Sequence, residues 1–230
     1  MVGYIEESKG GDFRPTPEGV HLMVCTRVID LGTQKTEFNG EVKHQRKVLI
    51  SWEIPGERIQ VDGRDVPVLH SEKFTWSFHE KANLRKVLEA WRGKKFVDAD
   101  FAGPPNGFHI KNLLGVPCNG QVMHETGNNG RIYANLSSVM KYTAPREHWP
   151  QAEGELIFFD LDAPDRDLFS KLPKYWQGLI AESPEGRAAG LEAPRDDQSR
   201  APASMSGSHR AAYDAQAPDP RDADYDPIPF

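Results

Sequence analysis

The clearest two-residue alternation in the chain lies in Lys43-His44-Gln45-Arg46-Lys47-Val48-Leu49-Ile50-Ser51-Trp52-Glu53-Ile54. One face of this stretch is apolar and consists of Val48, Ile50, Trp52 and Ile54. The opposite face is polar and basic and consists of Lys43, Gln45, Lys47 and Ser51. Because side chains alternate across a strand, the pattern predicts a half-buried β-strand with a basic outer face. Trp52 shares the apolar face, so we expect it to pack in the core.

Strands are also predicted on both sides of this stretch. Val20 to Leu31 is apolar and rich in β-branched residues, which favours a strand, and Gly32 to Gly40 follows as a polar turn region. Arg58 to Leu69 contains Asp62-Gly63, a turn signal typical of a hairpin or an elaborated loop. His70 to Phe78 alternates again and predicts a third strand.

The apolar period changes after the third strand. Within Glu80 to Arg92, apolar residues recur at helical spacing, and Gly93 stands where a C-terminal cap is expected. Val116 to Glu125 and Arg131 to Thr143 are β-prone and are separated by Asn128-Asn129-Gly130, a hairpin signal. The second of these strands is expected to place Ile132, Ala134, Leu136 and Met140 on one face. Its other face is expected to carry Arg131, Tyr133, Asn135 and Lys141.

Three strands, a helix and two strands in that order match the OB-fold, a five-stranded Greek-key barrel whose face and loops bind oligonucleotides. The sequence therefore predicts a mainly β, OB-fold body with insertions and a helix between the third and fourth strands. Another mixed α+β barrel or sandwich is the alternative, because element order alone leaves the topology open. Beyond the barrel, Leu156 to Leu161 predicts a short strand, and Leu168 to Ile180 predicts an amphipathic helix despite Pro173.

Composition divides the 230 residues into a body and a tail. From Glu182 onward there are ten Asp and Glu against five Arg, and every lysine lies at or before Lys174. Large aliphatic residues are scarce from about Ser183, which is typical of disorder. We expect a loosely ordered lead-in at 1–18, an OB-fold-like domain at 19–181, a disordered linker at 182–221 and an acidic tip at 222–230. The body is then close to neutral, although the whole chain carries a net charge of -6.

Other bulk features bear on location and chemistry. No apolar run approaches the length of a membrane helix, and the first residues lack the pattern of a secretory signal. The two cysteines, Cys25 and Cys118, form no CxxC motif, so we expect reduced thiols and a cytoplasmic protein. No metal or cofactor is expected, because the histidines lack metal-binding spacing and no glycine-rich phosphate loop is present.

The chain closes with acidic residues followed by an apolar, aromatic end. This end resembles the C-terminal tip of bacterial single-stranded DNA-binding proteins, over about the last ten residues. The matching residues are Asp222, Asp224, Asp226, Pro227, Ile228, Pro229 and Phe230. The resemblance implies a peptide that docks on replication and repair proteins, with Phe230 in an apolar pocket and the acids and carboxylate on basic residues. The two prolines would keep this peptide extended and lower its entropy loss on docking.

Binding of single strands requires cations for the phosphates and aromatic faces for the bases. The residues that we expect to bind DNA are Lys43, Arg46, Lys47, Lys73, Trp76, Arg131, Tyr133 and Lys141. Tyr133 is the favoured stacking residue, because it lies on the polar side of its strand. Phe74, Trp76 and Phe78 form either part of the core or a platform for bases. The basic residues Lys86, Arg92, Lys94 and Lys95 form either a solvated helix end or part of a DNA track.

One segment suggests an enzyme instead. Leu156 to Asp162 resembles the first motif of haloacid-dehalogenase-like phosphatases, an apolar strand that ends in Asp160-x-Asp162. In that family the two acids are nucleophile and general acid and base, with Mg²⁺. The resemblance departs at Ala163-Pro164, which replace the usual Gly-Thr. A strand end and a helix N-terminus explain these acids better, and we expect no catalytic residues.

Together these features predict a non-catalytic, largely sequence-independent single-stranded DNA-binding protein that protects strands in replication, recombination or repair. The body is longer than the ordinary bacterial domain by insertions such as Arg58 to Leu69, which favours a phage or mobile-element version. We expect it in the cytoplasm of a bacterial cell or phage-infected host, associated with the nucleoid. A homo-oligomer is one alternative for its assembly. The competing hypothesis is a protein-interaction adaptor whose tip competes for host repair proteins.

Overall fold

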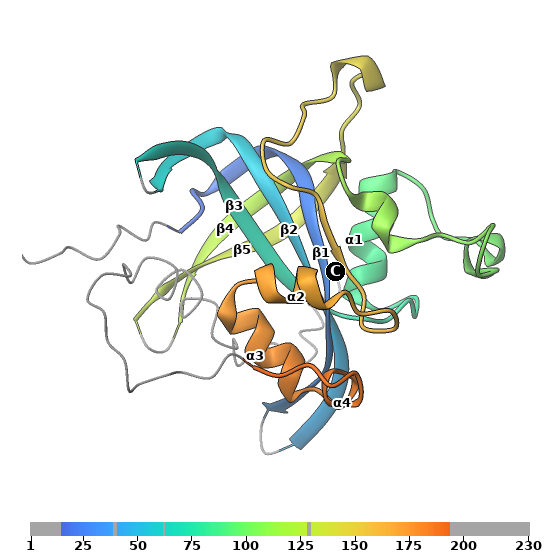
Figure 1. Cartoon of the computed structure of the whole chain (residues 1–230). Coiled ribbons are helices and arrows are strands. Elements are labelled where there is room, and N and C mark those ends of the chain that lie inside the picture. The colour runs from blue at the N-terminus through green and yellow to red at the C-terminus, as the bar shows by residue number, and fades with distance from the viewer. Residues whose placement is uncertain (1–14, 39–40, 62, 128–129, 194–230) are drawn as a thin grey trace, which may run out of the picture.

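The computed structural model describes residues 15–38, 41–61, 63–127 and 130–193. This part of the chain is mainly β, with one six-stranded, largely antiparallel sheet and a few helices (Figure 1). The strands are β1 (Gly19–Phe38), β2 (Glu41–Val61), β3 (Arg64–Thr75), β4 (Pro117–Thr126), β5 (Ile132–Lys141) and β6 (Ile157–Phe159). The helices are α1 (Asn83–Arg92), α2 (Arg166–Lys171), α3 (Lys174–Glu182) and α4 (Pro184–Ala188). Three 3₁₀ turns are η1 (Asp98–Phe101), η2 (Ile110–Leu113) and η3 (Arg146–His148).

The predicted order of three strands, a helix and two strands is confirmed for β1 to β5. Hydrogen-bonded neighbours in the sheet follow the order β3-β2-β1-β4-β5, and β6 pairs in parallel with β1. The helix predicted before Gly93 is α1, and Gly93 ends it with a φ of 69°. This left-handed conformation suits glycine, which has no Cβ to clash with the backbone.

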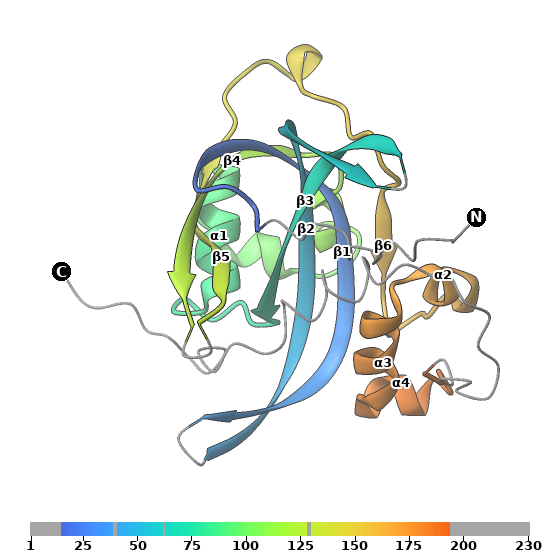
Figure 2. The same ribbon diagram turned by 90° about the vertical axis from the view of Figure 1, so that its left-hand side faces the viewer.

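The first two strands are longer than predicted. Gly32 to Phe38 was expected to form a turn, but it continues β1 and pairs with β2 from Gly32 opposite Lys47 to Phe38 opposite Glu41. A register shift between Asp30 and Gly32 bends the strand at this point. Figure 2 shows the result, a two-stranded ribbon that extends beyond the rest of the sheet.

The sheet curves so that its edge strands approach each other. Glu72 of β3 accepts a hydrogen bond from the backbone N–H of Leu136 in β5, with an N–O distance of 2.7 Å. The same carboxylate lies 3.3 Å from Nε2 of His70, whose Nδ1 lies 3.1 Å from the hydroxyl of Thr16. His70 and Thr16 are buried. Glu72 therefore links β3 to β5, and Thr16, expected in a loosely ordered lead-in, is fixed to the body.

Two apolar cores lie on opposite sides of β1 and β2. The inner core joins residues of β1 to β5, such as Val48 and Trp52, to the apolar stripe of α1. The outer core joins Ile29, Leu31 and Leu49 to β6 and to helices α2 and α3. In Figure 2, α1 and α2 to α4 accordingly lie on opposite sides of β1 and β2.

The outer core changes the prediction for β2. The strand is buried on both faces from Lys47 to Ile54, so it is not a half-buried strand with an open basic face. Ser51 and Glu53 lie on the face that was expected to be exposed, and both are buried. Glu53 accepts hydrogen bonds from the backbone N–H groups of Glu153 and Gly154 at 2.8 and 3.0 Å. The covering layer comes from about one hundred residues further along the chain, so local alternation carries no signal of it.

A bulge in β5 reverses its predicted faces. Gln121 pairs with Ser138 and Val122 pairs with Leu136, which leaves Ser137 as an extra residue. Beyond this point Val139 is buried, whereas Met140 is 50% exposed. The prediction that Met140 shares a face with Ala134 and Leu136, and that Lys141 shares a face with Tyr133, is therefore wrong.

The C-terminal part of the body also differs from the predictions. Pro173 breaks the expected single helix into α2 and α3, because proline has no N–H to continue the helical hydrogen bonds. The expected linker boundary at 182 lies too early, since α4 follows and Leu191 is buried. Glu185 accepts hydrogen bonds from the hydroxyl and backbone N–H of Thr33 at 2.6 and 2.8 Å. The remainder of the predicted linker and the tip at 222–230 lie outside the described residues.

Within the described ranges, every helix is too short or too polar to cross a bilayer.

Two glycine substitutions test whether α4 belongs to the folded body. A Cβ on Gly186 would lie 1.9 Å from the carbonyl oxygen of Ile180, whereas a Cβ on Gly178 in α3 meets nothing within 4 Å. We expect Gly186→Ala to destabilise the protein by about 1–3 kcal/mol, because the close contact must be relieved. Gly178→Ala should stabilise it by about 0.5–1 kcal/mol through helix propensity. Urea unfolding measures both, and equal effects of the two variants would contradict the packing of α4.

Candidate nucleic-acid interface

Three of the predicted lysines share one sheet face. Strand pairing places Lys47 opposite Thr75 and Leu49 opposite Lys73, and directly paired residues lie on the same face. Lys43 lies four residues before Lys47, so it is on this face as well. We call Lys43, Lys47 and Lys73 the lysine face of β2 and β3. Lys43 and Lys73 are half-buried, and the face continues from the β1–β2 ribbon toward β3.

Lys47 has a different environment from the other two lysines. Only 6% of it is exposed, and its Nζ donates a hydrogen bond to the hydroxyl of Thr75 at 3.0 Å. A buried ammonium adds positive potential beneath the surface, but it has little freedom to reach a phosphate. Lys43 and Lys73 are therefore the more accessible lysines of this face, whereas Lys47 is mainly a structural residue.

Arg46 is held by carboxylates. Its Nε donates to Asp30 at 3.1 Å, its Nη2 also donates to Asp30, and Nη2 donates to Asp162 at 2.9 Å. The hydrogen bonds to Asp30 raise the pKa of the guanidinium further above its already high value. The side chain of Asp30 is 1% exposed and that of Asp162 is 74% exposed. Two acids thus neutralise Arg46, which makes it a poor phosphate ligand.

Trp76 contacts Arg46 through both its backbone and its indole ring. Its backbone N–H donates to the carbonyl of Arg46 at 2.7 Å, and the guanidinium carbon of Arg46 lies 5.2 Å from the centre of the indole ring. This distance is that of a cation–π contact. Arg46 therefore orients Trp76, which is half-buried at the end of β3. Phe74 was predicted to lie either in the core or on a platform for bases, and it is buried in the inner core.

The predicted packing role of Trp52 is confirmed, and Trp91 packs beside it. Trp52 is fully buried, and its ring centre lies 5.6 Å from that of Trp91. The Nε1 of Trp91 donates to the carbonyl of Pro117 at 3.0 Å.

The predicted residues of β5 separate into two places. Ala134 and Leu136 pack against the inner core, so Tyr133 points to the outer face of the sheet. The bond from Leu136 to Glu72 brings this part of β5 next to β3, and Arg131 directly precedes the strand. Lys141 lies beyond the bulge, with its side chain against Gly93 at the end of α1. Tyr133 and Arg131 thus join the side of the body near β3, whereas Lys141 belongs to the α1 side.

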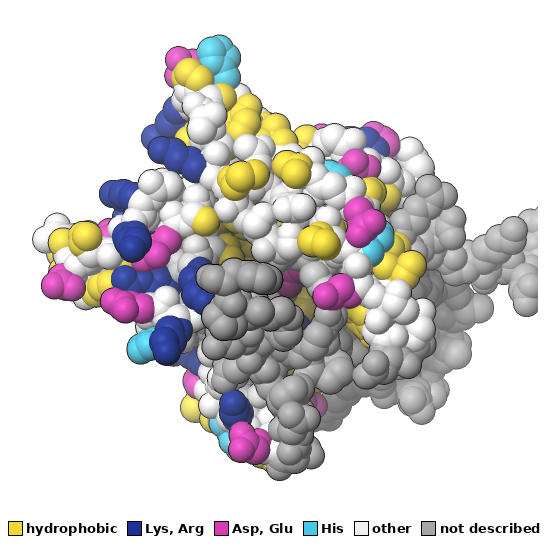
Figure 3. Space-filling model, turned by 180° about the vertical axis from the view of Figure 1, so that it is seen from behind, with side chains coloured by type: hydrophobic (Ala, Val, Ile, Leu, Met, Phe, Trp, Pro, Cys, Tyr) yellow, Lys and Arg dark blue, Asp and Glu magenta, His cyan; other side chains and the backbone are white. Residues whose placement is uncertain are grey.

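Basic residues also gather beside α1. Lys86, Lys94 and Lys95 are exposed, and Lys and Arg side chains follow the margin of Figure 3 that corresponds to the α1 side of Figure 1. Arg92, in contrast, donates to Asp100 at 2.8 Å and is largely buried. Three of the four basic residues predicted at the helix end are therefore exposed.

The acidic motif after β6 has structural partners. The side chain of Asp160 accepts from the backbone N–H of Asp162 at 2.9 Å, and Asp162 pairs with Arg46. Asp165 caps α2 by accepting from Asp167 and Leu168. No group of three or more metal-binding side chains occurs among the described residues. These contacts agree with the interpretation of the acids as a strand end and a helix cap.

The cysteine thiols are not activated. Both are free and buried, and burial raises the pKa of Cys25 and of Cys118 above the ordinary value. A thiolate is the reactive form of cysteine, so these side chains behave as apolar core residues.

Sequence reasoning missed one feature of this surface. Four phenylalanines surround a small cavity between the end of β3 and the loop after α1, namely Phe78, Phe96, Phe101 and Phe108. Of these four phenylalanines, only Phe78 was predicted to belong either to the core or to a platform for bases. The available signal was the density of phenylalanine and basic residues between 78 and 111, but the fold of this loop could not be foreseen from it.

A scan of protein-family models found none that matches this chain, and a search of curated proteins likewise found no match.

The two partners of Arg46 allow a matched stability test. Asp30→Asn removes a buried negative charge that accepts hydrogen bonds from Arg46 and from the backbone N–H of Gly32. We expect it to destabilise the protein by about 2–3 kcal/mol, because hydrogen bonds to a buried charge are lost. Asp162→Asn changes an exposed partner and should cost less than about 1 kcal/mol. Urea unfolding compares the variants, and a small loss for Asp30→Asn would show that Arg46 does not depend on it.

Proposed function

We propose that this chain is a non-catalytic, largely sequence-independent single-stranded DNA-binding protein with an OB-fold body. The observation that carries the proposal is the lysine face of β2 and β3, together with the link through Glu72 and Leu136 to β5, which carries Tyr133. The face of strands 2 and 3 and its adjacent loops form the oligonucleotide-binding surface of OB-folds. Cations and an aromatic side chain on this surface match the requirements of a single strand.

The topology supports an OB-fold body. In such a barrel the first strand pairs with both the second and the fourth, and the third and fifth strands meet to close the barrel. Here β1 pairs with β2 and β4, and the edge strands β3 and β5 are linked through Glu72. The helix α1 lies between β3 and β4 in the chain, as the fold requires, and contacts both β3 and β5.

Partner recruitment is the second part of the proposal. We assign to the tip, Asp222 to Phe230, the docking of replication and repair proteins, on the basis of its sequence alone. Its acids also resemble phosphates in charge, so we expect the tip to compete with DNA for the lysine face at low salt. The chain would act at the nucleoid, in the cytoplasm of a bacterial cell or phage-infected host. It would be a phage or mobile-element protein, and a homo-oligomer is one form that it could take.

The alternative function is a protein-interaction adaptor. It is favoured by the engagement of Arg46 with Asp30 and Asp162, and by the burial of Lys47. The layer of α2 to α4 also covers part of the outer face of β1 and β2, which shortens any groove for DNA. An adaptor would use the same surface for another protein.

Fluorescence anisotropy with labelled oligo-dT tests the DNA role. We expect the full chain to bind it more tightly than a duplex, and the affinity to fall steeply with salt because counterions are released. Lys73→Ala should weaken binding and reduce the salt slope by about one. Lys171→Ala in α2 is the matched control and should bind as the parent does. Absence of binding at low salt would remove the DNA role and favour the adaptor.

Deletion of Asp222 to Phe230 tests competition by the tip. We expect tighter binding of oligo-dT at low salt, because an intramolecular competitor of opposite charge to the lysine face is removed. The triple variant Asp222→Asn, Asp224→Asn and Asp226→Asn should reproduce the effect, and Phe230→Ala should not. Unchanged affinity in the deletion variant would contradict competition by the tip.

A further inference from the structure

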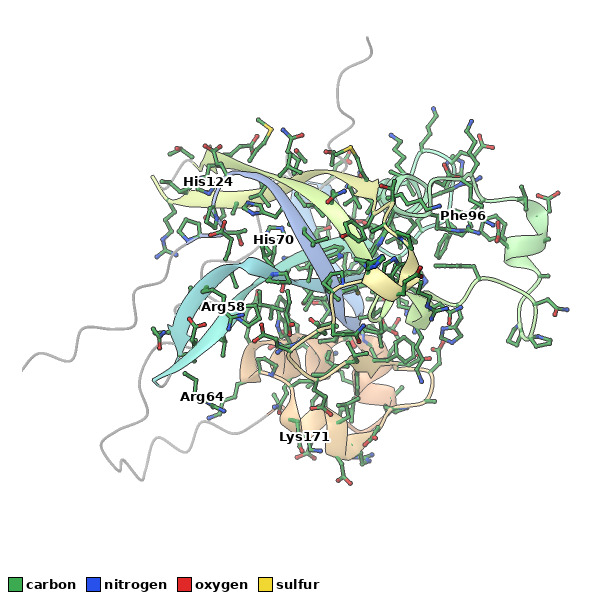
Figure 4. All side chains as sticks on the ribbon, turned by 90° about the horizontal axis from the view of Figure 1, so that it is seen from above. Arg58, Arg64, His70, Phe96, His124 and Lys171 are labelled. Carbon is green, nitrogen blue, oxygen red and sulfur yellow. The ribbon has the colours of Figure 1, made fainter. Side chains whose placement is uncertain are left out.

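We propose that the cavity bordered by Phe78, Phe96, Phe101 and Phe108 holds one nucleobase of a bound single strand. This inference rests on the proposed DNA-binding function and extends the DNA path from the lysine face to the α1 side of the body. We call these four residues the phenylalanine pocket. Figure 4 shows Phe96 on one side of the molecule, remote from Arg58 and Arg64 of the β2–β3 hairpin.

The pocket is built almost entirely from aromatic rings. Its volume is about 170 Å³, and Asp100 and Gly103 complete its lining. The ring centre of Phe96 lies 5.6 Å from that of Phe78 and 5.2 Å from that of Phe108, and both pairs meet edge to face. Phe96 is 5% exposed and forms the base, whereas Phe101 is 47% exposed and forms the outer wall. The ring centre of Phe101 also lies 5.6 Å from that of Phe96 and 6.0 Å from that of Phe78, so its exposed part is what it offers to a planar ligand.

Arginines support the rings from outside. The guanidinium carbon of Arg92 lies 4.3 Å from the ring centre of Phe96, and that of Arg85 lies 5.5 Å from the ring centre of Phe101. Asp100 fixes Arg92 through a 2.8 Å hydrogen bond, and this contact lowers the pKa of the Asp100 carboxyl. Glu89 fixes Arg85 at 2.9 Å and accepts from the backbone N–H of Phe96 at 3.0 Å. The pocket is thus held open by an ordered frame of hydrogen bonds.

The size and composition of the pocket favour a single ring system. Pockets for drug-sized molecules are about 300–1,000 Å³, so this cavity suits something much smaller. Aromatic walls stack on any of the bases, because every base has a π-face. Between residues 79 and 111 there are seven Lys and Arg against four Asp and Glu, a balance of +3. A planar ring that carries a phosphate matches this combination of aromatic walls and positive surroundings.

The pocket follows the proposed DNA surface closely in the chain. Phe78 is two residues beyond Trp76, which follows β3 directly, and β3 carries Lys73. Lys94 and Lys95, which directly precede Phe96 in the chain, are exposed. Trp76 and Phe78 both pack against the inner core, so the proposed single strand passes from the lysine face around the end of β3 to the phenylalanine pocket.

The rival occupant is an aromatic side chain of an acidic peptide, such as Phe230 of this chain. Such a peptide also combines a ring with negative charge. The closeness of the pocket to β3 in the chain favours a nucleobase, and the experiment separates the two.

The test uses oligo-dT that contains 5-iododeoxyuridine at single positions, crosslinked by ultraviolet light to the full chain, with peptides identified by mass spectrometry. We expect crosslinks to Phe101 or Phe96. In anisotropy titrations, Phe101→Ala should weaken binding of a long oligo-dT about tenfold, because one stacked base is lost. Phe101→Tyr should retain affinity. Val20→Ala, at a position 62% exposed on β1, is the control for loss of an exposed apolar side chain and should have no effect.

The outcomes separate this inference from the proposed function. Failure of the parent chain to bind oligo-dT would overturn both. Binding by the parent with unchanged affinity of Phe101→Ala, and no crosslinks in the pocket, would overturn the pocket alone. A labelled peptide of residues 222–230 is titrated in parallel. If Phe101→Ala abolishes binding of that peptide and spares oligo-dT, the pocket reads an acidic peptide and the proposal is wrong.

Discussion

Backbone pairing along β1 is the constraint on which the rest of the structure depends. It pairs with β2 from Val24 to Phe38, while its other edge pairs first with β4 from Gly19 to Val24 and then with β6 from Arg27 to Ile29. Every other part of the sheet is placed by one of these partners. The strand also supplies both cores, because Val28 faces the inner core and Ile29 faces the outer one. Two register shifts bend β1, which lets one strand serve the curved sheet, the ribbon and the helical layer together.

Local signals in the sequence were sufficient for the order of the strands, but not for their lengths. The alternation of Val48 to Ile54, the helical period before Gly93 and the two hairpin signals predicted β1 to β5 and α1 in the correct order. What failed depended on residues distant in the chain. Lys47 was predicted to be a surface cation, but Thr75 and the surrounding structure bury it. Ser137 shifts the pairing of β5 and exposes Met140, and a single extra residue leaves no mark on the apolar pattern. Pro173 divides the expected single helix into α2 and α3, and α4 lies where a linker was expected.

The same distinction applies to the candidate site. Residue type predicted which side chains were basic or aromatic, but their availability is decided by tertiary partners. Arg46 is held by Asp30 and Asp162 and positions Trp76, whereas Lys73 and Tyr133 stay on the outer surface of neighbouring strands. The net charge of -6 conceals this arrangement, because most of the excess acid lies from Glu182 onward. A near-neutral body with local clusters of lysine can still attract a phosphate chain, since the field near a surface depends on nearby charges.

The central claim is that single-stranded DNA binds the outer face of β2, β3 and β5. Amide chemical-shift mapping of the ¹⁵N-labelled full chain with unlabelled oligo-dT tests it most directly. We expect the largest shifts on the lysine face around Lys43 and Lys73, and on Tyr133 of β5, which Glu72 links to β3. Shifts confined to α2, α3 and α4, or a spectrum unchanged by saturating oligo-dT at low salt, would contradict it.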